Sequence, residues 1–333
     1  MNFLKNKSIL ITGGTGSFGS RFLRFLLKLK SNRPKKVIVF SRDELKQFEL
    51  SKIFSEKDYP TVRYFLGDIR DKQRLKMAFD DVDYVIHAAA LKQVPTAEYN
   101  PIEFVKTNVI GSQNIIEAAL EKNVEKVIAL STDKASSPIN LYGATKLCAD
   151  KLFLSANTLT GKKITSFSVV RYGNVFGSRG SIIPFFLDLI KKKQKLIITD
   201  PNMTRFNIDL DDAVKLVINS INTSIGGEIF VPKISSYRLM DVVKAIQDKK
   251  NFKIVGIRQG EKLHEELISK AEGYNTFDLG KYFIIAGNQK SFNYYSKKKY
   301  KKIKIGKNYN SLDNTDFLNV GQIKKLIKTY NNL

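Results

Sequence analysis

Short apolar runs alternate with amphipathic stretches through the first half of the chain. The runs are rich in Ile, Val, Leu and Phe, as buried strands are, and the stretches between them carry apolar residues at helical spacing. Strands that alternate with helices form a parallel sheet covered on both faces, so the pattern predicts a doubly wound α/β fold. The predicted strands are residues 8–12, 36–40, 62–66, 83–87, 127–130 and 165–171, and a long helix is predicted at 102–122.

The pattern loosens after residue 177. We expect the chain to return to the first domain near residue 207, so that this domain comprises residues 1–177 and 207–227. A smaller α/β domain is then expected from residues 178–206 and 228–333. The elements predicted in this half are an apolar helix at 182–190, a short strand at 196–198, a polar-aromatic turn at 203–206 and a helix at 211–220.

Composition is that of an ordinary globular protein. Of the 333 residues 43% are hydrophobic, no run approaches the roughly 18 apolar residues of a membrane span, and residues 1–7 lack the apolar core of a signal peptide. We therefore expect a cytoplasmic protein without a membrane partner. The net charge of +24 suggests an anionic partner, but runs such as 296–304 are typical of a solvated lysine-rich face, and we expect no nucleic-acid partner.

Cysteine and histidine are too scarce for metal or triad chemistry. The single Cys148 cannot form an internal disulfide. Beside Leu147 on a predicted helix, it is expected to be a buried packing residue without a chemical role. Only His87 and His264 occur, without a Cys/His cluster, so we expect neither a metal site nor a Ser-His-Asp triad. Acid–base chemistry must therefore fall to Tyr, Lys, Asp and Glu.

A glycine-rich turn joins the first strand to the first helix. Gly13, Gly16 and Gly19 have the spacing that lets the backbone approach a pyrophosphate and aims the helix amino terminus at it. A strand before the turn and a helix after it are the context that dinucleotide binding demands. The alternative is a tight turn without a ligand. The other turn residues expected at the cofactor are Thr15, Ser17 and Phe18.

The residues after the second strand favour NADP over NAD. An acidic residue at the strand end would accept the ribose hydroxyls of NAD. The strand instead runs into Ser41-Arg42-Asp43, with Lys46 one turn into the next helix, and the two cations can hold a 2′-phosphate. Asp43 alternatively caps the helix that begins at Glu44.

Further cofactor contacts are expected along the carboxyl edge of the sheet. Asp68, followed by Ile69, is placed to hydrogen-bond the adenine amino group or else to cap a helix. Ala88 opens a run of small residues that lets a cofactor lie against the backbone. Lys92 can face the cofactor or an anionic substrate, and Thr107 faces the sheet edge or merely packs.

Residues 131–146 concentrate the proton-transfer groups. A buried parallel strand delivers its carboxyl end into a crevice, so Asp133 and Lys134 should lie there. Tyr142 and Lys146 are four apart on the following helix and can meet a common ligand. A phenol, with a pKa of about 10, is a poor base at neutral pH unless a cation such as Lys146 stabilises the phenolate. A tyrosine and a lysine at this spacing also occur by chance in many helices.

Together these residues resemble the extended short-chain dehydrogenase/reductase superfamily, whose fold is of the Rossmann type. Within it the chain is similar to the inverting UDP-N-acetylglucosamine 4,6-dehydratases, nearly from end to end. The most diagnostic position is Lys134, because the retaining sugar-nucleotide dehydratases carry Thr-Asp-Glu where this chain has Thr132-Asp133-Lys134. The resemblance is carried by Thr-Gly-Gly-Thr-Gly-Ser-Phe-Gly at 12–19, Tyr-Gly-Ala-Thr-Lys at 142–146, and residues 41–47, 88–92, 131–135, 174–181 and 203–206.

The resemblance implies a reaction in three stages. Hydride passes from sugar C-4 to the nicotinamide, the acidified C-5 proton and the 6-hydroxyl are lost, and hydride returns to C-6 with inversion at C-5. Tyr142, helped by Lys146 and Thr132, would take the 4-hydroxyl proton. Asp133 would protonate the leaving hydroxyl, which needs a raised pKa, and Lys134 would take the C-5 proton, which needs a lowered pKa. The two residues can also exchange roles or share a proton.

The same resemblance implies the product and the assembly. The product would be UDP-2-acetamido-2,6-dideoxy-β-L-arabino-hexos-4-ulose, a precursor of pseudaminic acid or a related surface sugar. Tightly bound NADP, recycled in each turnover, and a homo-oligomer, either a dimer or a hexamer, are also implied. Gln93 departs from the histidine usual in flagellar-sugar members and matches capsule-sugar members, so the downstream pathway stays open.

Two arginines in non-periodic stretches suit the diphosphate of a nucleotide sugar. Arg205 and Arg258 are of this kind, although loop arginines are more often surface charges. The resemblance implies that Lys92, Asn174, Thr199, Met203, Arg205, Arg258 and Glu261 surround the UDP-sugar, and that Val175 lies at the cofactor.

Two other functions fit parts of the sequence. A UDP-sugar 4-epimerase needs Tyr142 and Lys146 but gives Asp133 and Lys134 no task. A cofactor-retaining protein that binds RNA through its basic surface would turn over no sugar nucleotide. Solvent deuterium separates the two enzymes, because a dehydratase must incorporate it at C-5.

Overall fold

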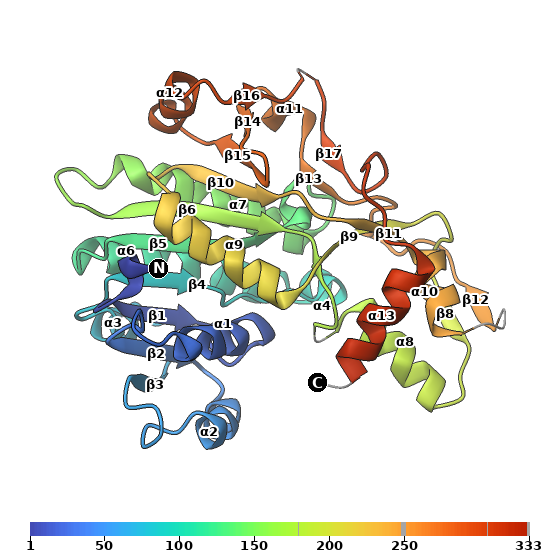
Figure 1. Cartoon of the computed structure of the whole chain (residues 1–333), viewed down its shortest axis with the longest axis horizontal. Coiled ribbons are helices and arrows are strands. Elements are labelled where there is room, and N and C mark those ends of the chain that lie inside the picture. The colour runs from blue at the N-terminus through green and yellow to red at the C-terminus, as the bar shows by residue number, and fades with distance from the viewer. Residues whose placement is uncertain (179, 248–250, 305, 332–333) are drawn as a thin grey trace.

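A ten-stranded sheet with helices packed against it runs through the molecule (Figure 1). The computed structural model describes residues 1–178, 180–247, 251–304 and 306–331, so Arg179 of the motif at 174–181 lies outside the described residues. Seven parallel strands follow the order β10-β6-β5-β4-β1-β2-β3, which confirms the predicted doubly wound α/β fold. Their bounds are β1 (Ser8–Thr12), β2 (Lys36–Ser41), β3 (Val62–Leu66), β4 (Tyr84–His87), β5 (Lys126–Thr132), β6 (Ser166–Tyr172) and β10 (Glu228–Pro232).

Helices cover both faces of the sheet because successive strand residues point to opposite sides. Ile9 belongs to the same core as Phe22 and Ile218, on one face, whereas Leu10 belongs with Ile115 on the other. The first face carries α1 (Ser17–Lys28), α2 (Glu44–Ile53) and α9 (Leu210–Thr223), and the second carries α3 (Lys72–Ala78), α6 (Gly111–Glu121) and α7 (Leu141–Ser155).

The sheet continues past β6 with strands from the last third of the chain. In β10, Ile229 pairs with Val169 of β6 and, on its other side, with Ile285. Residues 228–333 were expected to form part of a second domain. That division stays a prediction, but the structure shows that part of this segment extends the main sheet. The antiparallel strands added beyond β10 are β15 (Tyr282–Ala286), β14 (Thr276–Asp278) and β16 (Lys301–Lys302).

A second lobe with its own core lies on the right of Figure 1. Ile183, Leu196, Val243 and Ile323 are among the side chains buried in it. Its elements are α8 (Ile182–Lys191), β8 (Leu196–Ile198), α10 (Leu239–Ile246), β12 (Phe252–Ile254) and α13 (Val320–Asn331). The remaining segments carry β13 (Glu266–Ile268), α11 (Lys270–Gly273), α12 (Gln289–Lys297) and β17 (Tyr309–Asn310).

The turn predicted at 203–206 is wrong, because these residues begin strand β9 (Thr204–Ile208). Thr204, Phe206 and Ile208 are buried while the residues between them are partly exposed, which is the alternation of a strand. The strand lies between β11 (Ser236–Arg238) and β7 (Asn174–Val175). Arg205 is therefore held on a strand and not on a loop.

The helix predicted at 102–122 is present in three consecutive pieces. A π-helical stretch, Val105–Ile110, separates α5 (Pro101–Phe104) from α6. Within it, the side chain of Asn108 accepts from Leu91 N and donates to Leu91 O, both at 2.9 Å, and also donates to Thr145 of α7. The irregular turn thus connects the loop before α4 (Val94–Tyr99) to α7.

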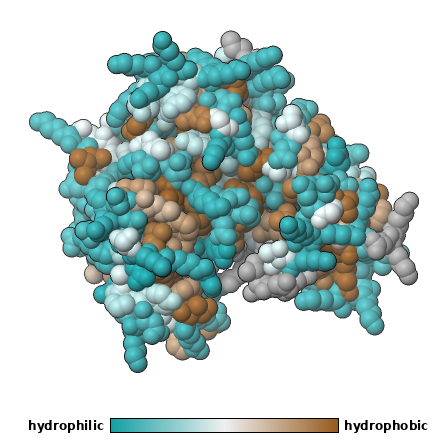
Figure 2. Space-filling model, in the orientation of Figure 1, coloured by the Kyte–Doolittle hydropathy of each residue, from teal (hydrophilic) through white to brown (hydrophobic). Residues whose placement is uncertain are grey.

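Hydrophilic side chains cover most of the face shown in Figure 2. Cys148 is exposed, so the expectation that it is buried was wrong. The inward face of α7 carries Tyr142, Lys146, Ala149 and Phe153, and helical periodicity turns Cys148 away from them. Among the described residues, no helix has both the length and the apolar character that crossing a bilayer requires.

Candidate active site

The end of β5 and the start of α7 meet at a glycine. Asn140 caps α7 by accepting a hydrogen bond from Gly143 N at 2.8 Å, and Thr132 accepts one from Lys134 N at 3.4 Å. A Cβ on Gly143 would lie 2.2 Å from the carbonyl oxygen of Lys134. Because nothing larger than glycine fits there, the turn at 133–135 lies directly against the helix that carries Tyr142.

The glycine turn has the close packing that a dinucleotide cradle requires. Gly13 has a φ of +64°, and a Cβ there would lie 2.9 Å from the backbone of Ala89. A Cβ on Gly19 would lie 2.5 Å from Gly14 Cα, so α1 can begin close to the strand only with glycine at this position. The amino terminus of α1 therefore faces open space beside the sheet, as a pyrophosphate site demands.

A groove runs from this turn to the end of β5. It brings together the glycine turn, the strand ends and α7, which were predicted separately. The predicted cofactor residues that line it are Gly13, Gly16, Ser17, Phe18, Gly19, Ala88, Lys92, Tyr142, Lys146 and Val175. The predicted cofactor residues that do not line it are Thr15, Ser41, Arg42, Asp43, Lys46, Asp68, Ile69 and Thr107.

The residues after β2 form a small polar network. The Thr15 and Ser41 hydroxyls lie 2.9 Å apart, and the Asp43 side chain accepts from Lys46 N at 3.0 Å. Asp43 therefore caps α2, which confirms the alternative role considered for it. The Lys46 ammonium also pairs with the Asp43 carboxylate, and Arg42 extends as a half-exposed side chain. Both cations lie on the segment that follows β2, outside the residues that line the groove.

Asp68 binds arginines and does not cap a helix. Its carboxylate pairs with Arg70 at 2.7 Å and with Arg42 at 3.6 Å, while Asp71 caps α3. Burial acts to raise the pKa of Asp68, but hydrogen bonds from Arg70 prevail and lower it. The neighbouring Ile69 is buried, and the buried hydroxyl of Thr107 has no hydrogen-bond partner among the described residues.

Tyr142 and Lys146 are buried on the face of α7 that borders the groove. Burial raises the pKa of Tyr142 to about 12, while the charge of Lys134 and a hydrogen bond with Thr132 act to lower it. Lys146 Nζ donates to the Leu130 carbonyl at 2.8 Å, and burial lowers its pKa. A phenol in this setting loses its proton only with help from nearby cations.

Lys134 lies between two carboxylates. Its Nζ is 3.1 Å from Asp133 Oδ1 and 3.2 Å from Glu265 Oε1. Burial acts to lower the pKa of Lys134, but the charges of Asp133 and Glu265 outweigh it and raise the pKa. This direction is the reverse of the lowered pKa that the sequence argument required. Burial raises the pKa of Asp133, in the direction expected of a general acid.

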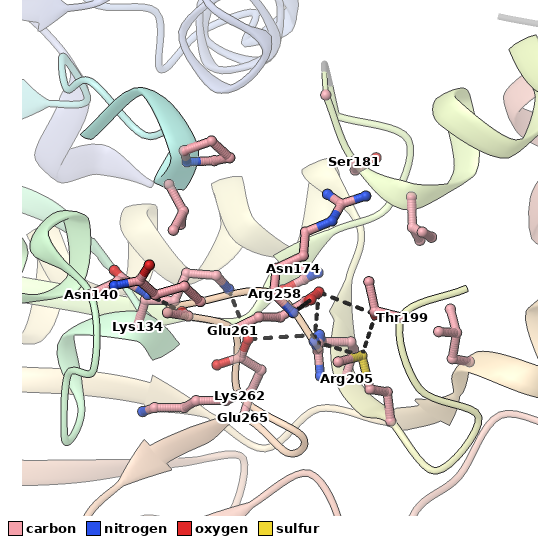
Figure 3. Close-up of a pocket in the computed structure, with 18 of the residues that line it drawn as sticks. Lys134, Asn140, Asn174, Ser181, Thr199, Arg205, Arg258, Glu261, Lys262 and Glu265 are labelled. Atoms are coloured by element: carbon pink, nitrogen blue, oxygen red, sulfur yellow. Dashed lines mark hydrogen bonds and ion pairs between the residues drawn. The ribbon is translucent and has the colours of Figure 1, made fainter. Parts of the chain in front are cut away.

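A second pocket shares Lys134, Asn174 and Ser181 with the groove (Figure 3). Arg205 is largely buried and its Nη2 lies 3.6 Å from Glu261 Oε1 and 3.3 Å from Met203 Sδ. Thr199 donates to Met203 Sδ at 3.1 Å. The predicted substrate residues that line this pocket are Asn174, Thr199, Met203, Arg205, Arg258 and Glu261, whereas Lys92 lines the groove.

Sequence reasoning missed several residues of this pocket. Glu265 contacts Lys134, Lys262 donates to the Ser136 carbonyl, and Asn140 donates to the Gly260 carbonyl. Glu265 and Lys262 belong to the non-periodic segment 257–265, and Asn140 contacts that segment. A dense run of charged residues after Gly260 was the sequence signal for this part of the pocket. The neighbouring sequence does not distinguish which of its glutamates would contact Lys134.

Comparisons with known proteins give a consistent result. A family model described as polysaccharide biosynthesis protein matches residues 9–287. A UDP-N-acetylglucosamine 4,6-dehydratase (inverting) from Campylobacter jejuni is 50% identical, over 96% of this chain and 97% of its own length. A UDP-glucose 4-epimerase from Rickettsia canadensis is 40% identical, over 98% of this chain and 96% of its own length. The X-ray structure of Pen from Bacillus thuringiensis is 38% identical and superposes with a TM-score of 0.89, covering 98% of this chain and 99% of that one.

Proposed function

The chain belongs to the polysaccharide biosynthesis protein family, and from this membership and its site we propose that it is a UDP-N-acetylglucosamine 4,6-dehydratase that inverts C-5. The observation that carries the proposal is the adjacent Asp133 and Lys134, where the cofactor groove meets the second pocket. An acid and an amine at this junction can act on neighbouring atoms of a sugar that reaches both. The 50% identity to an inverting dehydratase over nearly the whole chain supports the same reaction.

The first proton transfer falls to Tyr142. Its phenol borders the groove and hydrogen-bonds with Thr132, and the Lys134 charge favours the phenolate. Tyr142 takes the proton of the sugar 4-hydroxyl. Lys146, whose Nζ is held by Leu130 O, is a second lysine that lines the same groove. When bound in the groove, a nicotinamide cofactor would supply the hydride chemistry at C-4 and C-6. C-5 would then take a proton derived from solvent, on the face opposite Lys134, which completes the inversion.

The elimination falls to Asp133 and Lys134. In the resting site the proton lies on the lysine, because its pKa is raised. Passing this proton across the 3.1 Å contact gives a neutral amine and a neutral acid. The amine takes the C-5 proton while the acid gives its proton to the leaving 6-hydroxyl, which departs as water. The pair then has its starting charges again.

The nucleotide is bound by the second pocket. Arg205 and Arg258 both line it and suit the two phosphates of UDP. Asn174, Thr199 and Glu261 offer an amide, a hydroxyl and a carboxylate for the sugar and ribose hydroxyls. Met203 contributes apolar surface, and Lys92, from the groove side, faces the junction.

NADP is the cofactor that the residues after β2 favour. Arg42 and Lys46 provide two cations where a 2′-phosphate would lie, and Ser41 provides a hydroxyl. The glycine cradle at Gly13 and Gly19 fits the pyrophosphate in either cofactor. We infer that NADP stays bound and is recycled within each turnover.

A UDP-sugar 4-epimerase is the second candidate, because the Rickettsia canadensis relative of that name is 40% identical. Epimerisation needs an oxidising base such as Tyr142 and a cofactor groove. It leaves the buried Asp133 and its contact with Lys134 without a task.

The test is incubation of the purified protein with UDP-N-acetylglucosamine in heavy water without added cofactor, followed by NMR of the product. A dehydratase gives a 4-keto, 6-methyl sugar that carries deuterium at C-5. A product that keeps its 6-hydroxyl, or no product, would overturn the proposal. Lys134→Ala should still oxidise C-4, which the nicotinamide absorbance reports, while water loss collapses by about 100-fold or more.

A further inference from the structure

Glu265 is a buried carboxylate fixed at the back of the active site. It immediately precedes β13, and its side chain is 3% exposed. Its backbone N donates to the Ser311 hydroxyl at 2.9 Å, and its carbonyl accepts from Ser311 N at 2.8 Å. These bonds hold the backbone on both sides, so the carboxylate has little freedom to move.

This carboxylate is directed at Lys134. Glu265 Oε1 lies 3.2 Å from Lys134 Nζ and 3.7 Å from Arg205 Nε, and Figure 3 shows the two cations on either side of it. Glu265 Oε2 is buried without a hydrogen-bond partner among the described residues. Keeping a carboxylate in the interior with one oxygen unpaired is costly, and no structural contact of Oε2 repays that cost. Among the residues that the structure describes, Lys134 is the lysine whose ammonium forms an ion pair with Glu265.

We propose that Glu265 is a positioning residue, which fixes the Lys134 amine at the junction of the two pockets and sets the pH range in which that amine is free to act as a base. The inference rests on the proposed function for its role in turnover. It assigns a task to a residue that is remote in sequence from the Asp133-Lys134 pair. In this role Glu265 acts through Lys134, and its longer contact with Arg205 is a separate interaction.

The proton balance follows from the charges of the three groups. At rest the site holds the Lys134 ammonium between two carboxylates. Elimination begins when one N–H bond of Lys134 breaks and one O–H bond of Asp133 forms. Glu265 keeps its negative charge throughout, so it opposes the loss of the ammonium charge and makes the neutral amine a stronger base. The amine is therefore scarcer at low pH and more reactive where it exists.

Other charged and titratable groups face Lys134 from every element around it, and they limit the effect that a single change can have. Arg205 acts to lower the pKa of Lys134, in opposition to the carboxylates. The groups that interact with Lys134 are Asp133 from the turn after β5, Glu265 and Lys262 from the segment before β13, Arg205 from β9, Lys92 from the loop before α4, Tyr142 from α7 and Tyr237 from β11.

The first measurement is the titration of Lys134 itself. Lysine labelled at the ε-carbon is followed by NMR, and Lys134→Ala identifies the resonance. Glu265→Gln keeps the shape and removes the charge, so the titration midpoint should fall by about 1–3 pH units, as for removal of a close opposite charge. Glu265→Asp keeps the charge, so its Lys134 titration midpoint should stay much nearer to that of the parent protein. An unchanged midpoint in Glu265→Gln, or equal shifts in the two variants, would overturn the proposal.

The second measurement is the pH profile of water loss from UDP-N-acetylglucosamine. The acidic limb should move to lower pH in Glu265→Gln, with a lower maximal rate, whereas a merely structural role would lower the rate at all pH values without moving the limb. Glu266→Gln is the matched control, because the Glu266 carboxylate accepts hydrogen bonds from Ser136, Ser137 and Asn308 and is not among the charges that shift the pKa of Lys134. The acidic limb should stay in place in this variant. A shifted Lys134 titration in a protein without dehydratase activity would remove the proposed function and leave the electrostatic role of Glu265 standing.

Discussion

Replacing Arg171 with methionine should destabilise the fold far more than the same change at Arg21. Arg171 is fully buried, and its guanidinium lies 3.1 Å from Asp150 Oδ2 and 2.9 and 3.0 Å from the two oxygens of Glu272. Removing it leaves two interior carboxylates unpaired, which costs about 3–5 kcal/mol. Arg21 forms an equally short pair with Asp211, at 2.7 and 2.6 Å, but at the surface, where the loss is about 1 kcal/mol or less.

The expected shift in melting temperature follows from the length of the chain. The entropy of unfolding is about 2.1 cal/mol/K per residue, which for 333 residues amounts to about 0.7 kcal/mol/K. Arg171→Met should therefore lower Tm by about 4–7 °C and Arg21→Met by about 1 °C. Thermal unfolding followed by circular dichroism measures both. Equal losses in the two variants would refute the reasoning from burial.

The pH dependence gives a second check on Arg171→Met. Burial already raises the pKa of Asp150 in the folded protein, and loss of the guanidinium raises it further. A carboxyl whose folded pKa exceeds its unfolded pKa favours folding when protonated, and this contribution is lost as pH rises. The deficit in Tm should therefore shrink between about pH 8 and about pH 5. A Tm deficit that grows as the pH falls would contradict this. Adding Asp150→Asn and Glu272→Gln to Arg171→Met removes the unpaired carboxylates and should restore most of the lost Tm.

Two further changes test the site. Gly143→Ala forces a methyl group against the Lys134 carbonyl, so thermal unfolding should show a stability loss of about 1–3 kcal/mol and turnover should fall. Ala144→Ser, at the exposed neighbouring position, is the control and should change neither the stability nor the turnover. Arg42→Ala should weaken NADP by about tenfold to 100-fold and leave NAD nearly unaffected in equilibrium binding, and an equal loss for both cofactors would contradict the assignment of Arg42 to the 2′-phosphate.

The parallel half of the fold was predictable because each strand is an apolar run bounded by polar residues. The alternation with helices makes these strands parallel, whereas the switch that places β4 beside β1, on the side away from β2, depends on tertiary contacts. Strand β9 was not recognised, because Thr204 and Arg205 gave it a polar beginning and only pairing with β11 reveals its alternation. The antiparallel strands at the far edge depend on contacts with β10, which no local pattern encodes.

The site was predictable to the extent that its members are neighbours in sequence. Asp133 and Lys134 follow a strand, and Tyr142 and Lys146 share a helix face, so local geometry brings them together. Glu265 belongs to a distant segment, and its contact with Lys134 depends on how that segment folds back over the turn. The lowered pKa of Lys134 was inferred from the neutral amine that a base requires, and the charges of Asp133 and Glu265 raise this pKa instead.

The central position of β10 has a consequence for synthesis on the ribosome. The other six parallel strands of the sheet precede β10 in the chain and emerge first. The outer edge of β6, at Val169 and Val170, finds its partner only when residues 228–232 have followed. Until then a growing chain presents an unpaired apolar edge, open to pairing with other polypeptides. Nascent chains arrested before this point should therefore bind chaperones or associate with one another.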